Sequence, residues 1–219
     1  MRGVFVTGTG TEVGKTVVAA IIARTLAASG ERVAVFKPVV TGLEEDGEAD
    51  HELLRRAAGS AQGDEEIAPY RYGPPASPHL AAAMAGEEID PERLLEAACA
   101  AAGDADALVC EGVGGLLVPL APGYLVRDLA ADLKLPLAIA ASPGLGTINH
   151  TLLTVEAARA AGLEVAAVVL TPWPERPSRI EESNRETIAA LGEVRVETLP
   201  PLELADPRTW PMLPLLPPS

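Results

Sequence analysis

Short apolar runs alternate along the chain with longer helix-forming segments, and glycine or proline stands at most of the changes. Residues 3–7 (GVFVT) are apolar and β-branched, which predicts a strand, and residues 15–28 follow a glycine-rich turn with the pattern of a helix. The same reasoning predicts strands at residues 32–37, 107–111, 137–141, 165–170 and 194–199, and helices at 50–58, 91–102, 148–161 and 177–191.

Three segments carry neither pattern. Residues 43–49 are acidic and punctuated by glycine, which predicts an exposed loop. Residues 69–78 contain four prolines, so we expect no regular element there but a surface or site-lining loop. The proline-rich tail beyond residue 199 is expected to be irregular.

Alternating strands and helices predict an α/β fold with a mostly parallel sheet and helices on both faces, formed by a single domain over residues 1–219. Ligands of such sheets bind beyond the carboxyl ends of the strands. The candidate functional segments are therefore those that follow strands, namely residues 7–15, 37–41, 111–115, 142–149 and 171 onward.

Composition narrows the class of protein. Hydrophobic residues make up 48% of the chain and aromatic residues only 3%, which suits an aliphatic core around a parallel sheet. The net charge of −14 argues against a nucleic-acid surface. No uninterrupted apolar run of membrane-spanning length and no secretory signal is visible, and two cysteines, Cys99 and Cys110, exclude a disulfide framework. We expect a cytoplasmic protein without membrane contact.

The segment with the most specific chemistry is GTGTEVGKT, which runs from Gly8 to Thr16 between the first strand and the first helix. Backbone N–H groups and a helix N-terminus bind phosphate in such a loop, while Lys15 reaches the terminal phosphates and the Thr16 hydroxyl reaches magnesium. Gly8 and Gly14 enclose five residues where the usual motif has four. The fold class is thus a P-loop NTPase-like three-layer sandwich that uses a nucleoside triphosphate.

Three further residues are candidates for a site around this loop. Lys37 ends the second strand, where a fixed ammonium would stabilise charge on a transferring phosphoryl group. Glu111 closes an apolar strand, at the place where P-loop proteins hold an acidic magnesium ligand. Asp50 is either the N-cap of the following helix or a metal ligand. The neighbouring His51 is expected to face solvent.

Taken together, these motifs resemble one family, dethiobiotin synthetase. The resemblance runs over almost the whole chain, and its carriers are VTGTGTEVGKT (6–16), FKPV with Thr41-Gly42 (36–42), SPH (77–79), CEGVGGLLVPL (110–120) and GLGTINH (144–150). It implies an ATP-dependent ligase of biotin synthesis that closes the ureido ring from 7,8-diaminononanoate and CO2, through a carbamate and its mixed anhydride with phosphate.

The resemblance also implies roles for individual residues. Lys15, Lys37 and Thr11 would act in catalysis, and Thr16, Asp50 and Glu111 would hold Mg²⁺. Nucleotide contacts would come from those residues and from Glu12, Val13, Gly14, Val17, Gly112, Val113, Gly114, Thr171, Pro172, Pro200, Pro201 and Leu202. Substrate contacts would come from Thr41 and, across a homodimer interface, from Gly144, Leu145, Gly146, Thr147, Ile148 and Asn149, where a helix N-terminus suits a carboxylate.

Two departures from the family pattern leave alternatives open. The acidic loop before Asp50 is compact, so a shift of register would make Asp46 or Glu48 the metal ligand. Thr171-Pro172 stands where the family commonly has an asparagine that reads adenine, which predicts tolerance of other nucleotide bases.

Two other functions compete with dethiobiotin synthesis. A partition or cell-division type ATPase usually has an extra lysine early in its loop, where this chain has Gly8, Thr9 and Gly10. A glutamine-fed cobyrinate-type synthetase needs a glutaminase domain, which the sequence does not show.

Overall fold

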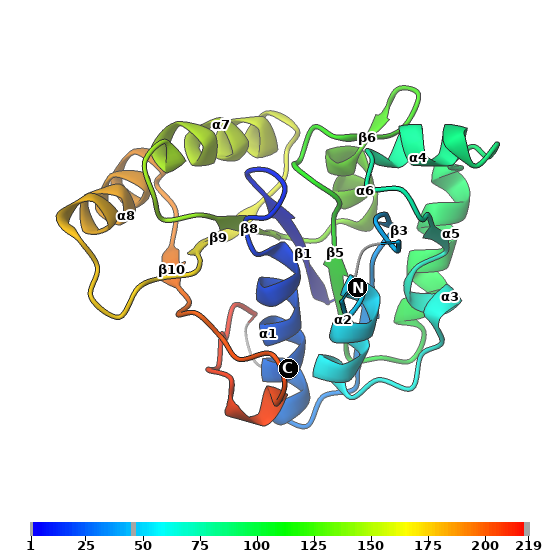
Figure 1. Cartoon of the computed structure of the whole chain (residues 1–219), viewed down its shortest axis with the longest axis horizontal. Helices are drawn as coiled ribbons and strands as arrows, with labels where there is room; N and C mark the ends of the chain where they lie inside the picture. Colours follow the sequence, from blue (N-terminus) through cyan, green and yellow to red (C-terminus); the bar gives the residue numbers. More distant parts are fainter. Residues whose placement is uncertain (1, 45–46, 217–219) are drawn as a thin grey trace.

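A six-stranded sheet organises the computed structural model, which describes residues 2–44 and 47–216. Every neighbouring pair in this sheet is parallel. The predicted α/β class with a parallel sheet is therefore confirmed (Figure 1). Its strands, in spatial order, are β10 (Val196–Thr198), β9 (Val165–Leu170), β8 (Leu137–Ala141), β1 (Gly3–Gly8), β5 (Ala107–Glu111) and β2 (Val33–Phe36).

Helices cover both faces of the sheet. One face packs on α1 (Lys15–Ala28) and α2 (Asp50–Ala58). The other packs on α5 (Pro91–Ala102), α6 (Val126–Leu133), α7 (Thr147–Ala160) and α8 (Arg179–Gly192). Side chains alternate between the two layers along each strand, so that Phe5 belongs to one apolar cluster while Val4 and Val6 belong to the other. This is the three-layer sandwich that the alternation of elements predicts.

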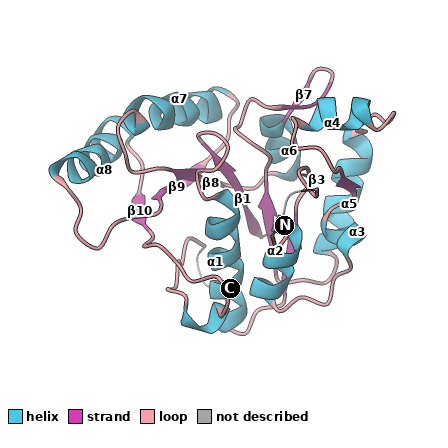
Figure 2. Cartoon of the chain, in the orientation of Figure 1, coloured by secondary structure: helices cyan, strands magenta, loops and turns pink. Residues whose placement is uncertain are grey.

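Several short elements lie outside the predicted set (Figure 2). Residues 69–78 were expected to contain no regular element, and this is wrong for β4 (Tyr70–Arg71), which pairs in parallel with β3 (Val39–Val40). Both strands form because they pair with each other, and the local pattern of apolar and polar residues does not predict this pairing. The other unpredicted elements are α3 (Asp64–Ile67), α4 (Pro78–Met84), the hairpin of β6 (Pro119–Ala121) and β7 (Tyr124–Leu125), α6, and a 3-10 turn, η1 (Pro207–Thr209).

The tail beyond β10 is largely irregular, as expected, yet it is packed against the molecule. Trp210 and Leu213 are buried in the apolar cluster that contains α1. The Leu213 N–H donates to Thr25 Oγ1 of α1 at 2.9 Å. Within the described part of the chain, no helix is both long and apolar enough to cross a membrane.

Candidate active site

The loop of residues 8–14 leads directly from β1 into α1. Gly14 adopts a left-handed conformation with φ of 85°, and a Cβ atom there would lie 2.6 Å from Thr171 Cγ2. A Cβ at Gly8 would lie 2.7 Å from Val13 Cγ2. Both glycines of the motif are therefore required for the loop to close tightly before the first N–H groups of α1.

Lys15 folds back over this loop. Its Nζ donates to the carbonyl oxygen of Gly10 at 2.7 Å, and the side chain is buried. Burial lowers the pKa of Lys15, and the negative charge of Glu111 opposes that shift. The ammonium is thus held where the terminal phosphates of a nucleotide in this loop would lie.

Four polar side chains meet beside the start of α1. Lys37, just after β2, donates from Nζ to Glu111 Oε1 at 2.8 Å and pairs with Asp50 Oδ2 at 2.5 Å. The Thr16 hydroxyl lies 3.0 Å from Asp50 Oδ1 and 2.9 Å from Glu111 Oε1. The carboxyl ends of neighbouring strands β2 and β5 bring Lys37 and Glu111 together, while α2 contributes Asp50 from its first residue.

The electrostatics of this cluster follow from burial. Lys37 is 4% exposed and Glu111 is 0% exposed. Burial raises the pKa of Glu111, and the charge of Lys37 opposes this. Burial alone would lower the pKa of Lys37, but Glu111 and Asp50 outweigh it and the pKa is raised. For Asp50, burial is outweighed by Lys37, so the pKa is lowered. Lys37 therefore stays charged between two carboxylates.

One oxygen in the cluster lacks a partner. Glu111 Oε2 is buried and accepts no hydrogen bond from any described residue. A buried carboxylate oxygen without a donor is costly unless a ligand satisfies it. Two carboxylates and a hydroxyl form the hard oxygen set that suits Mg²⁺, so Thr16, Asp50 and Glu111 fit a magnesium ion.

Glu48 and Asp46 are the two residues that could replace Asp50 as a metal ligand. Both carboxylate oxygens of Glu48 accept from the Arg56 guanidinium, at 2.8 and 2.6 Å, so Glu48 is engaged away from Thr16. Asp46 lies outside the described residues. Asp50 is the first residue of α2 and not its N-cap, which is Ala49.

The expectation that His51 faces solvent is wrong. Its side chain is buried on the side of α2 that faces α3, with Nε2 3.8 Å from Asp64 Oδ1. The short predicted helix gave no indication of which face would pack, because α3, which covers this face, was itself not predicted.

A cleft of about 730 Å³ joins most of the predicted residues. From the predicted set it is lined by Thr11, Glu12, Gly14, Lys15, Thr16, Val17, Lys37, Thr41, Asp50, Glu111, Val113 and Gly114. Residues 75–78 form one wall, as expected of a site-lining loop. Sequence reasoning missed Val39 and Val118, although each stands within the FKPV and EGVGGLLV motifs that signalled the site.

The segments predicted to hold the base lie beside the loop but do not line this cleft. Trp173 N–H donates to Leu199 O at 2.6 Å and Leu199 N–H donates to Leu170 O at 3.0 Å, which joins the chain after β9 to the chain after β10. These bonds bring Thr171 and Pro172 close to Pro200, Pro201 and Leu202. Thr171 is buried with its methyl group facing Gly14, as the close approach described above requires.

The predicted carboxylate-binding segment, residues 144–149, does not line this cleft. It lies nearby, because the next residue, His150, lines a second pocket together with Gly10 and Val118. Helix α7 begins at Thr147 after Gly146, and Leu145 is 95% exposed. Asn184 of α8 donates from Nδ2 to the carbonyl oxygens of Pro143 and Gly144 at 2.9 and 3.1 Å, which fixes the exposed turn.

Known proteins resemble this chain over most of its length. A family model described as an AAA domain matches residues 2–209. An ATP-dependent dethiobiotin synthetase BioD from Anaeromyxobacter dehalogenans (strain 2CP-1 / ATCC BAA-258) is 47% identical over 170 residues, which cover 78% of this chain and 76% of that protein. The chain belongs to the dethiobiotin synthetase family. A second member, from Bacillus subtilis (strain 168), is 36% identical over 197 residues, covering 90% of this chain and 85% of the relative.

Solved structures support the fold of this dethiobiotin synthetase family member. A ParA family ATPase from Chlorobium tepidum TLS superposes with a TM-score of 0.57 at 13% identity, covering 92% of this chain and 85% of that chain. A signal recognition particle receptor FtsY from Elizabethkingia anophelis gives 0.51 at 14% identity, and the match spans 60% of its length. These likenesses concern the P-loop fold alone.

Proposed function

We propose that this chain closes the ureido ring of dethiobiotin from 7,8-diaminononanoate, CO2 and ATP. One amine of the diamine takes up CO2 as a carbamate and releases a proton. The carbamate oxygen then attacks the γ-phosphorus of ATP, and ADP leaves. The second amine attacks the carbonyl carbon of the mixed anhydride, which forms the second C–N bond, expels phosphate and releases a second proton.

The observation that carries the proposal is the placement of Lys37. A buried, charged ammonium lies 2.8 Å from Glu111 and 2.5 Å from Asp50, on the cleft that Lys15 and the loop also line. Two fixed cations on one cleft suit a step in which negative charge passes between the carbamate oxygen and the γ-phosphate. Such a transfer depends mainly on positioning and on charge stabilisation, because the protein forms no covalent bond.

Thr16, Asp50 and Glu111 would hold Mg²⁺, since they offer three oxygen ligands and one of the buried oxygens lacks a donor. The ion would neutralise charge on the β- and γ-phosphates. Because Lys37 now occupies the space between Asp50 and Glu111, it would exchange part of this pairing for contacts with the carbamate when nucleotide binds. Thr11 and Thr41 on the same cleft would orient the diamine.

The substrate's carboxylate would bind at the start of α7 in a second subunit. Residues 144–149 do not line their own cleft, and two large apolar side chains of this region, Leu145 and Leu153, are exposed, which suits a surface that a partner covers. We therefore include a cytoplasmic homodimer, with composite sites at its interface, in the proposal.

The test is incubation of the purified protein with diaminononanoate, bicarbonate, Mg²⁺ and ATP, with dethiobiotin measured by mass spectrometry. We expect product and phosphate in equal amounts, and no product after chelation of divalent cations. Lys37→Met, which keeps the aliphatic stem, should lower kcat by a factor of about 10² or more while ATP still binds.

A partition-type ATPase is the functional alternative, and the same assay separates the two. Phosphate release that does not depend on diaminononanoate would favour the regulatory ATPase. Turnover by Lys37→Met near the unsubstituted rate would refute the role given to this lysine.

A further inference from the structure

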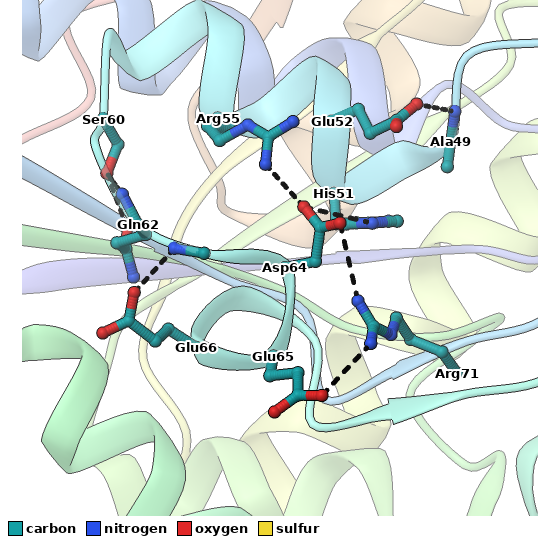
Figure 3. Close-up of polar contacts among 11 residues, drawn as sticks. Ala49, His51, Glu52, Arg55, Ser60, Gln62, Asp64, Glu65, Glu66 and Arg71 are labelled. Atoms are coloured by element: carbon teal, nitrogen blue, oxygen red, sulfur yellow. Dashed lines mark hydrogen bonds and ion pairs between the residues drawn. The ribbon is translucent and has the colours of Figure 1, made fainter.

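A polar cluster outside the cleft lining centres on Asp64, which opens the four-residue helix α3 (Figure 3). Asp64 Oδ1 accepts from Arg55 at 2.5 Å and lies 3.8 Å from His51 Nε2. Asp64 Oδ2 lies 3.6 Å from Arg71. A single carboxylate thus faces side chains from two other elements, α2 and β4.

The first of these links leads to the proposed metal site. Arg55 and His51 lie on α2, and Asp50 is the first residue of that helix. The contact between Asp64 and Arg55 therefore ties the helix that presents Asp50 to α3. Glu52 accepts from the Ala49 N–H at 3.1 Å, which fixes where α2 begins but not where the helix points.

The second link leads to the proposed diamine site. Arg71 stands opposite Val40 in the pairing of β4 with β3, and Tyr72 N–H donates to Val40 O at 2.9 Å. Thr41, which lines the cleft, follows Val40 directly. A shift of Arg71 would thus move Thr41 as well, because β3 has only two residues and pairs only with β4 among the described strands.

We propose that Asp64 is a positioning residue that holds two residues of the cleft lining, Asp50 and Thr41, in place relative to each other. This inference rests on the proposed function. The geometry separates its two arms: the Arg55 contact acts on the metal side through α2, and the Arg71 contact acts on the diamine side through β4 and β3.

The contacts do more for alignment than for folding. The Asp64 side chain is 42% exposed, and Arg55 and Arg71 are also partly exposed, so these ion pairs add little to the free energy of unfolding. Supporting groups around a metal ligand nevertheless change metal affinity or activity strongly when removed.

The two arms predict different kinetic effects. In Arg55→Met, the Mg²⁺ concentration for half-maximal activity should rise about 10-fold, with KM for diaminononanoate nearly unchanged. In Arg71→Met, KM for diaminononanoate should rise by a similar factor and the Mg²⁺ requirement should be unchanged.

The Asp64 variants combine these effects or separate them. Asp64→Ala should show both effects. Asp64→Asn keeps an acceptor for Arg55 but loses the charge that attracts Arg71, so it should behave like Arg71→Met.

The control is Arg195→Met, which makes the same change at a guanidinium that belongs to neither arm. Arg195 is partly exposed in its side chain and pairs with Glu197 at 2.6 Å, beside β10 at the opposite edge of the six-stranded sheet from β2. Its Mg²⁺ requirement and its KM should match the unsubstituted protein. Thermal unfolding of each variant checks that the fold is kept.

A measurement that does not need turnover is the affinity for Mg²⁺ with ADP present, by titration calorimetry. The Mg²⁺ affinity should weaken in Arg55→Met and Asp64→Ala and should be unchanged in Arg71→Met. Equal losses of kcat in all variants, with no change of Mg²⁺ affinity or KM, would overturn the inference. If the unsubstituted protein made no dethiobiotin, the proposed function would fail, while the calorimetric result would still decide the Asp64–Arg55 arm.

Discussion

Thr171 stands where the resemblance to the family leads us to expect an asparagine in the base site. Its buried side chain packs its methyl group toward Gly14 of the phosphate loop, and its backbone N–H donates to Ala141 O at 2.9 Å. A hydroxyl donates and accepts through a single oxygen, whereas an asparagine amide presents a donor and an acceptor side by side that together match the edge of adenine. We therefore expect weak selection of adenine at this position.

We predict that ATP, CTP and GTP all support turnover, with kcat/KM values within about 10-fold of one another, because one hydrogen bond is worth about 1 kcal/mol. Thr171→Asn should increase the preference for ATP. Thr171→Val keeps the contact with Gly14 and removes the hydroxyl, so its base preference should equal that of the unsubstituted protein. Initial rates over a range of each nucleotide measure this, and a preference for ATP above about 100-fold would contradict it.

At the same scale, the sequence predicts some contacts of the candidate site and not others. Lys37 follows β2 and Glu111 ends the neighbouring strand β5, so their proximity is a consequence of sheet geometry. The position of Asp50 depends instead on how α2 is oriented, which the sequence left open between a cap and a ligand. His51 was misjudged for the same reason, since its burial depends on the unpredicted α3.

At the scale of elements, the C-terminal tail acts as a cover for α1. The Leu213 side chain is 4% exposed against the cluster that contains α1, and its N–H is satisfied by Thr25 of that helix. Arg56 of α2 adds hydrogen bonds to the carbonyl oxygens of Leu204 and Ala205 at 3.0 and 3.3 Å. An irregular segment is thus fixed by side chains of two helices.

We predict that Leu213→Ala lowers the free energy of unfolding by about 2–4 kcal/mol, through lost burial and the cavity left against α1. Met212→Ala is the matched control, because Met212 is 52% exposed beside it. That change should stay within about 0.5 kcal/mol. Urea unfolding followed by circular dichroism gives both values, and equal midpoints for the two variants would show that the tail does not stabilise α1.

Elements with long, consistent patterns could be predicted, and elements that depend on distant partners could not. β1, β5 and β8 are buried aliphatic runs between turn residues, and they lie at the predicted positions. β3 and β4 have two residues each and exist only because they pair with each other. The hairpin of β6 and β7 is equally short, so no periodicity could reveal it.

At the scale of the whole molecule, the predicted carboxylate-binding turn lies outside the cleft that the two cations of the site line. Lys15 and Lys37 line the cleft, whereas residues 144–149 do not. The turn before α7 nevertheless has the exposed backbone and helix start that suit a carboxylate. A two-fold homodimer would bring the two together, since each cleft would receive the α7 start of the other subunit.

Mixing of inactive variants tests this arrangement. Asn149→Asp adds a negative charge near the start of α7, where it is compatible with the helix dipole but repels the substrate's carboxylate. Lys37→Met inactivates the cleft. Each variant alone should have little activity. Because a mixed dimer would contain one site with both defects and one with neither, an equal mixture after subunit exchange should regain about a quarter of full activity.

The control for mixing is a pair of variants whose changes fall in the same cleft. Lys37→Met with Lys15→Met should regain nothing, because every site of a mixed dimer then lacks one of its own two lysines. Sedimentation should report about twice the chain mass of 22.7 kDa for all variants. If the Asn149→Asp and Lys37→Met mixture regained no activity while subunits demonstrably exchanged, each site would be formed by one chain, and the carboxylate would have to bind within the cleft that Lys37 lines.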